Sequence, residues 1–262
     1  MQKALEFFSI FGGVEWGNID TTQEPFELVE KLILDDYSYI RNDISDMTTG
    51  MPLYHSILSG AALGDARIHS ALKKANVTEE VGLKALDELC ELGVIKLQKS
   101  KISSKIIFNA PFIRFWFAFV SPLFKGIRDG NYDEVKQRFQ NKFSDFVNQT
   151  FIQLSGELLK AEFRDDTIFS IKNYWDNGVE IDIYAKTKSK KTIVGSCRYS
   201  NAKIKKSELT KLQTKASEAK LDADIFVIVS KNGFSKELKA LKGDNLKLYT
   251  LKNFKRLVKD ER

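Results

Sequence analysis

The sequence predicts a mixed α+β and α/β protein with two parts, a helical N-terminal region at residues 1–130 and an α/β domain at residues 131–262. Apolar residues recur at helical spacing through most of the first part. In the second part, short strand-like runs alternate with helical patterns. A hydrophobic content of 43% with 19 Phe indicates well-filled cores and argues against a disordered chain.

The composition also argues against a membrane protein. No stretch approaches the roughly 20 consecutive apolar residues that a membrane-spanning helix needs. The apolar run at residues 1–16 contains Lys3 and Glu6 and has no small-residue cleavage site, which is not typical of a signal peptide. Cys90 and Cys197 each lie inside a predicted element, which favours reduced core thiols. We therefore expect a cytoplasmic protein with no membrane partner.

Three short helical patterns followed by two strands occupy the middle of the first part. The helical patterns cover residues 52–58, 66–75 and 78–92, and the strands cover residues 94–97 and 105–108. Thr78 is a good N-cap for the third helix, which ends at Gly93. This order predicts a winged helix-turn-helix at about residues 51–108.

The charges of this module favour its wing over its third helix as a DNA contact. Lys84 of the third helix is outnumbered by acidic residues. The wing carries Lys96, Lys99, Lys101 and Lys105, and is better suited to phosphate contact than the helix is to base reading. Because winged helices are often protein–protein or hinge modules, that role stays open beside DNA contact.

An aromatic segment and a long helix connect the two parts. Residues 112–124 are dense in Phe and Trp, which is more typical of an interdomain core than of a base-stacking platform. Helical spacing follows over residues 132–163, with Val135, Phe139 and Phe143 on the apolar positions.

The order of elements in the second part indicates its fold. After the long helix, strands are expected at residues 168–175, 179–185, 192–199, 224–229 and 246–250, and helices at residues 207–220 and 236–242. Asp176-Asn177-Gly178 is a typical hairpin turn between the first two strands. A Rossmann unit would need crossover helices between its first strands, so this αβββαβ order indicates a restriction-endonuclease-like core instead.

Positive charge is concentrated in one segment of the second part. The net charge is +6 and the pI about 9.0, and residues 184–220 contain ten Lys and one Arg against Glu208 and Glu218 only. A charge run is usually a solvated face, but beside a catalytic-type strand it indicates nucleic acid. A solvated face is favoured for the lysines of the following helix, with a relocated catalytic lysine as the alternative. The expected DNA-binding residues are Lys186, Lys188, Lys190, Lys191, Lys203, Lys205, Lys206, Lys211 and Lys215.

Acidic residues on the second strand suggest metal-dependent chemistry. Nucleases of this fold hold Mg²⁺ with an Asp on the second strand and Glu-x-Lys on the third, and the metal activates water and offsets phosphate charge. Glu180 and Asp182 are two residues apart on the second strand, so they are expected to share a face. The third strand carries Ser196 and Arg198 at the corresponding spacing.

Several motifs along the chain are shared with one known family. Phe11-Gly12-Gly13 is similar to a lid motif, residues 109–117 to an Arg-Phe-Trp signature, and Trp175 with Glu180-Ile181-Asp182 to a nuclease core. Through these motifs the chain resembles the uncharacterised C-terminal domain that follows archaeal-type P-loop ATPases, in the PD-(D/E)XK nuclease superfamily. The ATPase core itself is missing, because no Gly-x-x-x-x-Gly-Lys-Ser/Thr motif occurs. The resemblance implies a separate ATPase as a partner.

The chain departs from this family at its catalytic positions. The family's Gly-Glu-Cys-Lys-Trp is replaced by Gly195-Ser196-Cys197-Arg198-Tyr199, and a Phe-Glu on the preceding helix is replaced by Phe151-Ile152. Ser196 offers only a neutral oxygen, and Arg198 is a poor proton shuttle because its pKa is high. Glu157, further along that helix, is a candidate substitute for the lost acid.

The resemblance and its departures lead to two hypotheses. In the first, the protein is a divalent-metal-dependent DNA endonuclease or nickase, expected as a homodimer so that two sites meet two strands. Its catalytic residues would be Asp182, Glu180, Arg198 and Ser196. Mg²⁺ or Mn²⁺ would bind weakly to Asp182, with help from Glu180, Glu157 or the Cys197 carbonyl. In the second, a nuclease-like module has lost its chemistry and binds nucleic acid or a partner protein.

Overall fold

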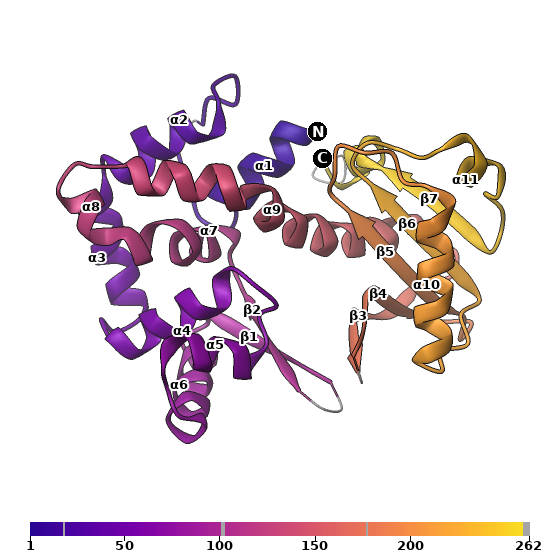
Figure 1. The fold of residues 1–262 in the computed structure, drawn as a ribbon, viewed down its shortest axis with the longest axis horizontal. Coiled ribbons are helices and arrows are strands. Elements are labelled where there is room, and N and C mark those ends of the chain that lie inside the picture. Colours follow the sequence, from indigo (N-terminus) through magenta and orange to yellow (C-terminus); the bar gives the residue numbers. More distant parts are fainter. Residues whose placement is uncertain (18, 101–102, 177, 259–262) are drawn as a thin grey trace. The chain divides into compact units, whose positions relative to one another are not determined.

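The computed structural model describes residues 1–17, 19–100, 103–176 and 178–258 (Figure 1). The chain divides into two compact units: Glu6–Phe146, here the N-terminal unit, and Met1–Leu5 with Val147–Arg262, here the C-terminal unit. The division falls inside one continuous helix, α9 (Asp133–Glu162), and not at residue 131 as the sequence suggested. The reason is that the first half of α9 places Phe139 and Phe146 in the core of the N-terminal unit. Among the helices of the described residues, none combines the length and apolar character that a membrane span requires.

The N-terminal unit contains the predicted helices and hairpin. The elements up to residue 128 are α1 (Gln2–Phe11), α2 (Pro25–Val29), η1 (Glu30–Leu34), α3 (Tyr37–Met47), α4 (Pro52–Ala62), α5 (Ile68–Ala75), α6 (Glu79–Glu91), β1 (Ile95–Lys99), β2 (Ser104–Phe108), α7 (Pro111–Phe115), η2 (Trp116–Val120), η3 (Ser121–Leu123) and α8 (Phe124–Arg128). The segments η1 and η2 are π-helical, and η3 is a 3₁₀ turn. Three helices, α4 to α6, therefore precede an antiparallel β1–β2 hairpin, as predicted.

The hairpin corrects one part of the predicted phosphate contact. Lys96 and Lys99 are exposed on β1. Lys105 is only 8% exposed, so it is a poor phosphate ligand, and the backbone of β2 at this position also forms a β-bridge with Arg67. Lys101 lies outside the described residues.

Aromatic side chains fill the core of the N-terminal unit. Phe146 of α9 makes edge-to-face contacts with Phe115 at 5.9 Å and with Phe119 at 5.2 Å between ring centroids. The buried Arg114 donates from Nε to the Ala62 carbonyl at 3.2 Å and from Nη2 to the Phe146 carbonyl at 3.0 Å. Burial lowers the pKa of Arg114 to about 9, so the guanidinium stays charged at neutral pH. The aromatic segment predicted as an interdomain core is thus the core of this unit.

The C-terminal unit is built on a five-stranded sheet in the order β3-β4-β5-β6-β7. Its elements after α9 are β3 (Ile168–Asp176), β4 (Val179–Thr187), β5 (Thr192–Arg198), α10 (Lys206–Glu218), β6 (Ile225–Ser230), α11 (Lys236–Ala240), β7 (Leu246–Thr250) and η4 (Leu251–Val258). β3, β4 and β5 are antiparallel neighbours, whereas β5, β6 and β7 run parallel. The predicted order of helix, three strands, helix, strand, helix and strand is therefore present. Asn177 of the predicted hairpin turn lies outside the described residues.

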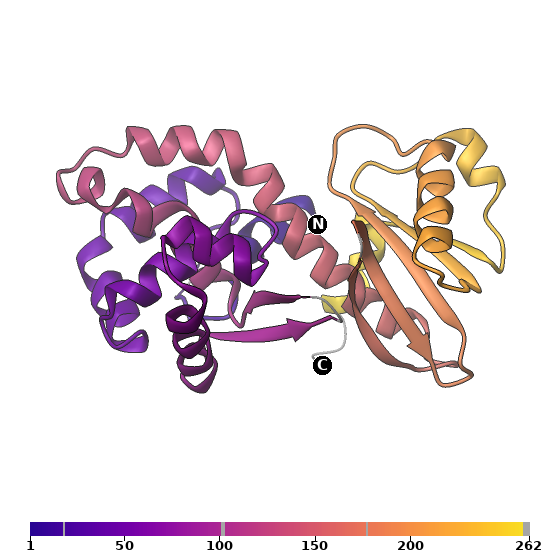
Figure 2. The same cartoon turned by 60° about the horizontal axis from the view of Figure 1, so that its bottom comes forward.

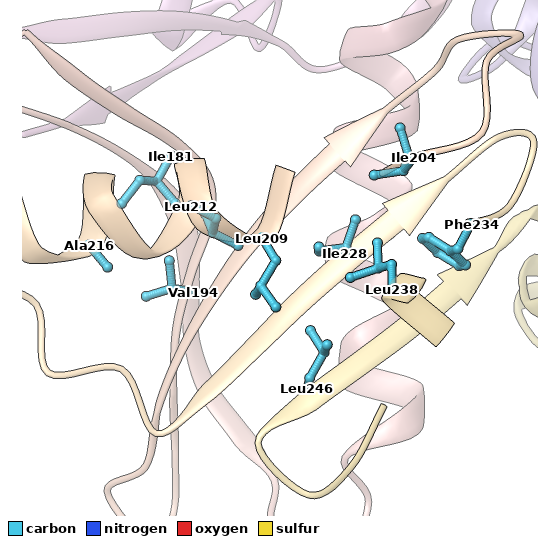
Figure 3. Close-up of a cluster of buried hydrophobic side chains, with 10 residues drawn as sticks. All are labelled: Ile181, Val194, Ile204, Leu209, Leu212, Ala216, Ile228, Phe234, Leu238 and Leu246. Atoms are coloured by element: carbon cyan, nitrogen blue, oxygen red, sulfur yellow. The ribbon is translucent and has the colours of Figure 1, made fainter. Parts of the chain in front are cut away.

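Helices cover both faces of this sheet (Figure 2). On one face, Leu212 of α10 and Leu238 of α11 join a buried cluster with Val194 of β5 (Figure 3). On the other face, the end of α9 approaches β3 at Gly156, where a Cβ would lie 3.3 Å from the Ile171 side chain. β5 is consequently buried along nearly its whole length, and only its last residue, Arg198, reaches towards solvent.

Candidate functional site

A β-bulge in β4 shapes the candidate site. Lys172 of β3 pairs with Tyr184 of β4, and Tyr174 of β3 pairs with Ile181 of β4. One residue of β3 is therefore opposite two residues of β4, and the first of these two is Asp182. Bulges bend a strand and change where its side chains point, and they are common beside functional sites.

Hydrogen bonds hold both the backbone and the side chain of Asp182. Its carbonyl accepts from the Asn173 side-chain amide at 2.7 Å. Its Oδ2 accepts from the Cys197 backbone N–H at 2.8 Å and from Arg198 Nη1 at 2.9 Å. The carboxylate of β4 and the arginine of β5 are thus brought together in an ion pair.

Arg198 also binds a second carboxylate, that of Glu208 in the first turn of α10. Arg198 Nη2 lies 2.7 Å from Glu208 Oε1, and the same oxygen accepts from the Ser196 hydroxyl at 2.6 Å. We call Asp182, Ser196, Arg198 and Glu208 the Arg198 network. The side chains of Asp182, Arg198 and Glu208 are 19%, 37% and 15% exposed, so the network is largely removed from water but reachable from it.

Burial and charge act in opposite directions on Asp182. Burial raises the pKa of its carboxyl above the ordinary 3.8, while Arg198, the Cys197 N–H and Lys215 lower it. Glu180 adds a smaller upward effect through its negative charge. The net shift of the Asp182 pKa is upward, so the destabilisation of the carboxylate by burial exceeds the stabilisation by these donors.

Glu208 is a member of this network that the sequence analysis did not assign. Its carboxylate lies beside Ser196, the side chain that stands where the resembled family has its catalytic Glu. A usable signal was present in the sequence. Glu208 is one of two acidic residues in the basic segment 184–220, and it opens the helix that follows β5.

Glu180 and Glu157 occupy other positions than the predicted ligand set requires. Glu180 lies on β4, and its backbone carbonyl accepts from Lys215 Nζ at 2.9 Å. Glu157 is exposed on α9 and pairs with Lys160 at 2.9 Å, one helical turn away. Among the described residues, no group of three or more His, Cys, Asp or Glu side chains is placed to hold a metal ion. The structure therefore does not assemble Asp182, Glu180 and Glu157 into one ligand set.

Seven of the nine predicted DNA-binding lysines fall into two groups, one at each end of β5, while Lys211 and Lys215 lie further along α10. The turn lysines, before β5, are Lys186, Lys188, Lys190 and Lys191, and the helix-start lysines, after β5, are Lys203, Lys205 and Lys206. The seven residues of β5 separate them, which corresponds to about 20 Å at roughly 3.3 Å per residue. Only the helix-start lysines adjoin Glu208 in the chain, so only they lie at the Arg198 end of the strand.

Exposure separates these lysines further. Lys215 is partly buried and donates to the Glu180 carbonyl, so it ties α10 to β4 and is a poor ligand for DNA phosphate, contrary to the prediction. Lys186 is also partly buried on β4. Seven of the predicted contacts are exposed and remain available to a polyanion: Lys188, Lys190, Lys191, Lys203, Lys205, Lys206 and Lys211.

Comparison with known proteins matches the middle of the chain to a family of unknown function. Residues 116–212 match the profile of DUF234, a family described as archaeal and bacterial proteins of unknown function. No curated protein matches the chain. A solved assembly of Thermococcus gammatolerans McrB AAA+ hexamers with bound McrC is 13% identical, with a TM-score of 0.28, over 79% of this chain and 51% of that one. The alignment spans about half of that chain, and a likeness at this level carries no argument about fold or function.

Proposed function

We propose that the C-terminal unit is a restriction-endonuclease-like module that has lost its chemistry and binds nucleic acid through its phosphates. The observation that carries this proposal is the position of Arg198, whose guanidinium contacts both Asp182 and Glu208. In a metal-dependent nuclease, a divalent cation would be shared by such a pair of carboxylates. Here a side chain of the protein supplies the positive charge.

The carboxylates as arranged do not fit Mg²⁺ or Mn²⁺. Asp182 Oδ2 and Glu208 Oε1 each already accept from two donors, and one of the two donors is Arg198 in both cases. Magnesium prefers six oxygen ligands in near-octahedral geometry, and an adjacent guanidinium repels a divalent cation. A metal ion would have to displace Arg198, which would then need a new partner.

Phosphate binding by this end of the sheet follows from the charges that remain exposed. The charge of Arg198 is compensated by Asp182 and Glu208, whereas the helix-start lysines are exposed and carry positive charge beyond β5. Lysines bind phosphate as mobile point charges. Each neutralised phosphate releases counterions, so this kind of binding depends strongly on salt.

A salt titration of DNA binding tests the proposal. Fluorescence anisotropy with a labelled duplex should give log K falling linearly with log salt, with a slope of about −0.9 per phosphate contacted. Binding should persist with EDTA, because the cation is part of the chain. Absence of binding at low salt, or a flat plot, would contradict the proposal.

Metal-dependent DNA cleavage is a second candidate function, and Glu208 is the observation that favours it. Its carboxylate lies beside Ser196, so the acid lost from β5 has a possible replacement on α10. Incubation of plasmid DNA with and without Mg²⁺ or Mn²⁺, followed by gel analysis, tests this candidate. Metal-dependent nicking that disappears in both Asp182→Ala and Glu208→Ala, with the fold intact, would establish it. Nicking that survives both substitutions would come from a contaminating nuclease.

Three finer expectations from the sequence are also proposals. We propose that α4 to α6 and the β1–β2 hairpin form a winged helix-turn-helix, from their order and from the exposed Lys96 and Lys99 on the wing.

A separate ATPase is proposed as a partner because Phe11-Gly12-Gly13 resembles a lid motif. A homodimer is proposed from the need of two sites for two DNA strands, and analytical ultracentrifugation tests it.

A further inference from the structure

The N-terminal unit contains a cavity of about 670 Å³, within the range of roughly 300–1,000 Å³ typical of small-molecule sites. It lies among α3, α4, α5, η2 and the first half of α9, which each contribute lining residues. Four of these residues are basic or can become so: Arg41, His55, Lys74 and Arg138. The described lining contains no Asp or Glu.

The three permanent cations of the lining have no acidic partner. Among the described residues, Arg41, Lys74 and Arg138 form no salt bridge. Among the described residues, the hydrogen bonds of Lys74 and Arg138 go to backbone carbonyls: Lys74 Nζ donates to Leu63 at 3.1 Å and to Gly60 at 3.4 Å, and Arg138 Nε donates to Ala118 at 2.7 Å. Carbonyls orient a cation without neutralising it, so the lining retains its positive charge.

The partial burial of Arg138 without an acidic partner costs free energy when no ligand is bound. Arg138 is half-buried, and burial lowers its pKa. The pKa of His55 is also lowered, first by burial and then by the charge of Arg41, so the imidazole is neutral at pH 7. Arg41 and Lys74 are exposed, so the cost of burial falls on Arg138, and an anion bound beside this half-buried guanidinium would offset it.

The rest of the lining offers polar donors and aromatic surface. The indole Nε1–H of Trp116 is buried and has no hydrogen-bond partner among the described residues. Trp116 belongs to the π-helical η2, a type of segment that is frequent at functional sites, and it stacks on Tyr37 at 5.6 Å. Phe124 is 39% exposed at the cavity, so its ring is available to an organic group. Ser59 and Ser121 add hydroxyls.

We propose that this cavity binds a small phosphorylated ligand of about nucleotide size, with at least two negative charges set against Arg41, Lys74 and Arg138. Lysine and arginine together with serine hydroxyls are the usual donors to phosphate oxygens. The exposed Phe124 provides the contact for the organic part. This site is separate from the nucleic acid surface proposed for the C-terminal unit and does not depend on it.

Calorimetry on the full chain with ATP, pyrophosphate and adenosine tests the proposal. ATP and pyrophosphate should bind, and adenosine should bind far more weakly because it lacks the charges. Lys74→Gln and Arg41→Gln should each weaken ATP binding about tenfold, since a charged hydrogen bond contributes roughly 1.5–3 kcal/mol. Both side chains are exposed at the surface of helices, so the fold should tolerate these changes.

A matched control is available one residue away. Lys73 is exposed on the same helix as Lys74 but does not line the cavity, so Lys73→Gln should bind ATP as the wild type does. A variant with glutamine at Lys203, Lys205 and Lys206 should also bind ATP normally. Failure of both phosphate compounds to bind in the millimolar range would overturn the proposal. Equal loss in the Lys73 and Lys74 variants, or loss only in the C-terminal variant, would overturn it too.

Discussion

The Ser196 hydroxyl of β5 donates a hydrogen bond of 2.6 Å to Glu208 of α10, so a carboxylate from the helix lies beside the strand position that lacks one. Because Arg198 binds the same Glu208 oxygen, the helix carboxylate reaches the strand only as part of an ion pair. Two charges of opposite sign, from Glu208 and Arg198, thus lie together beside the end of β5. This ion pair determines what each variant of the site should do.

Removal of the arginine should create a metal-sensitive protein. Arg198→Ala leaves Asp182 and Glu208 without their shared cation, and we expect a loss of about 1–3 kcal/mol of stability, reduced from a fully buried pair by the exposure of the arginine. Mg²⁺ should then raise the melting temperature of this variant but not that of the wild type. Thermal denaturation with and without Mg²⁺ measures both effects.

The control for this prediction removes one ligand as well. In Arg198→Ala combined with Asp182→Asn, added Mg²⁺ should stabilise much less, because one of the two carboxylates is gone. Equal stabilisation of the wild type by Mg²⁺ would mean that Arg198 does not replace the cation.

Restoring the family's residues should not restore cleavage. Ser196 is 2% exposed and already contacts Glu208, so Ser196→Glu with Arg198→Lys would crowd a third acid into a buried position. We expect a less stable protein with no gain in plasmid nicking. Adding Glu208→Gln to this double variant should recover part of its stability, because it removes the repulsion between the new carboxylate and Glu208. A folded variant that nicks about tenfold faster than wild type, roughly 1.4 kcal/mol of transition-state stabilisation, would instead support the enzyme.

The two lysine groups should differ in their effect on DNA binding. Glutamine at Lys203, Lys205 and Lys206 should weaken binding about tenfold and reduce the salt slope, because these lysines lie at the Arg198 end of β5. The matched variant at Lys188, Lys190 and Lys191 removes the same charge from the opposite end. A larger loss in this second variant would place the DNA surface at the β4–β5 turn.

The pH dependence of stability should reveal the burial of Asp182. Its pKa is raised above 3.8 in the folded protein, so the folded state holds this proton more tightly than the unfolded state. The difference in unfolding free energy between the wild type and Asp182→Asn should therefore fall as pH rises from 3.8 towards the folded pKa. Urea unfolding at several pH values measures it. A difference that grows with pH would mean that Arg198 outweighs burial.

The sequence predicted the elements better than it predicted their side-chain partners. The order of strands and helices along the chain followed from hydrophobic spacing, but the pairing of Asp182 with Arg198 was not predicted. The contact between Glu208 and Ser196 could not be predicted from these patterns, because it depends on how α10 begins after a loop. The basic segment looked continuous in the sequence, but β5 divides it in space. Lys105 was predicted as a surface contact, but it is only 8% exposed in the structure.

The continuous helix α9 determines how this protein can be divided for experiments. A fragment that starts at residue 131 would carry Phe139, Phe143 and Phe146 away from the rings they pack on, and expose an aromatic stripe that invites aggregation. A fragment that starts at residue 147 keeps Phe151 against Tyr199 and Phe254 and leaves those three rings behind. The N-terminal fragment must correspondingly extend to residue 146, because Arg114 donates to the carbonyl of that last residue.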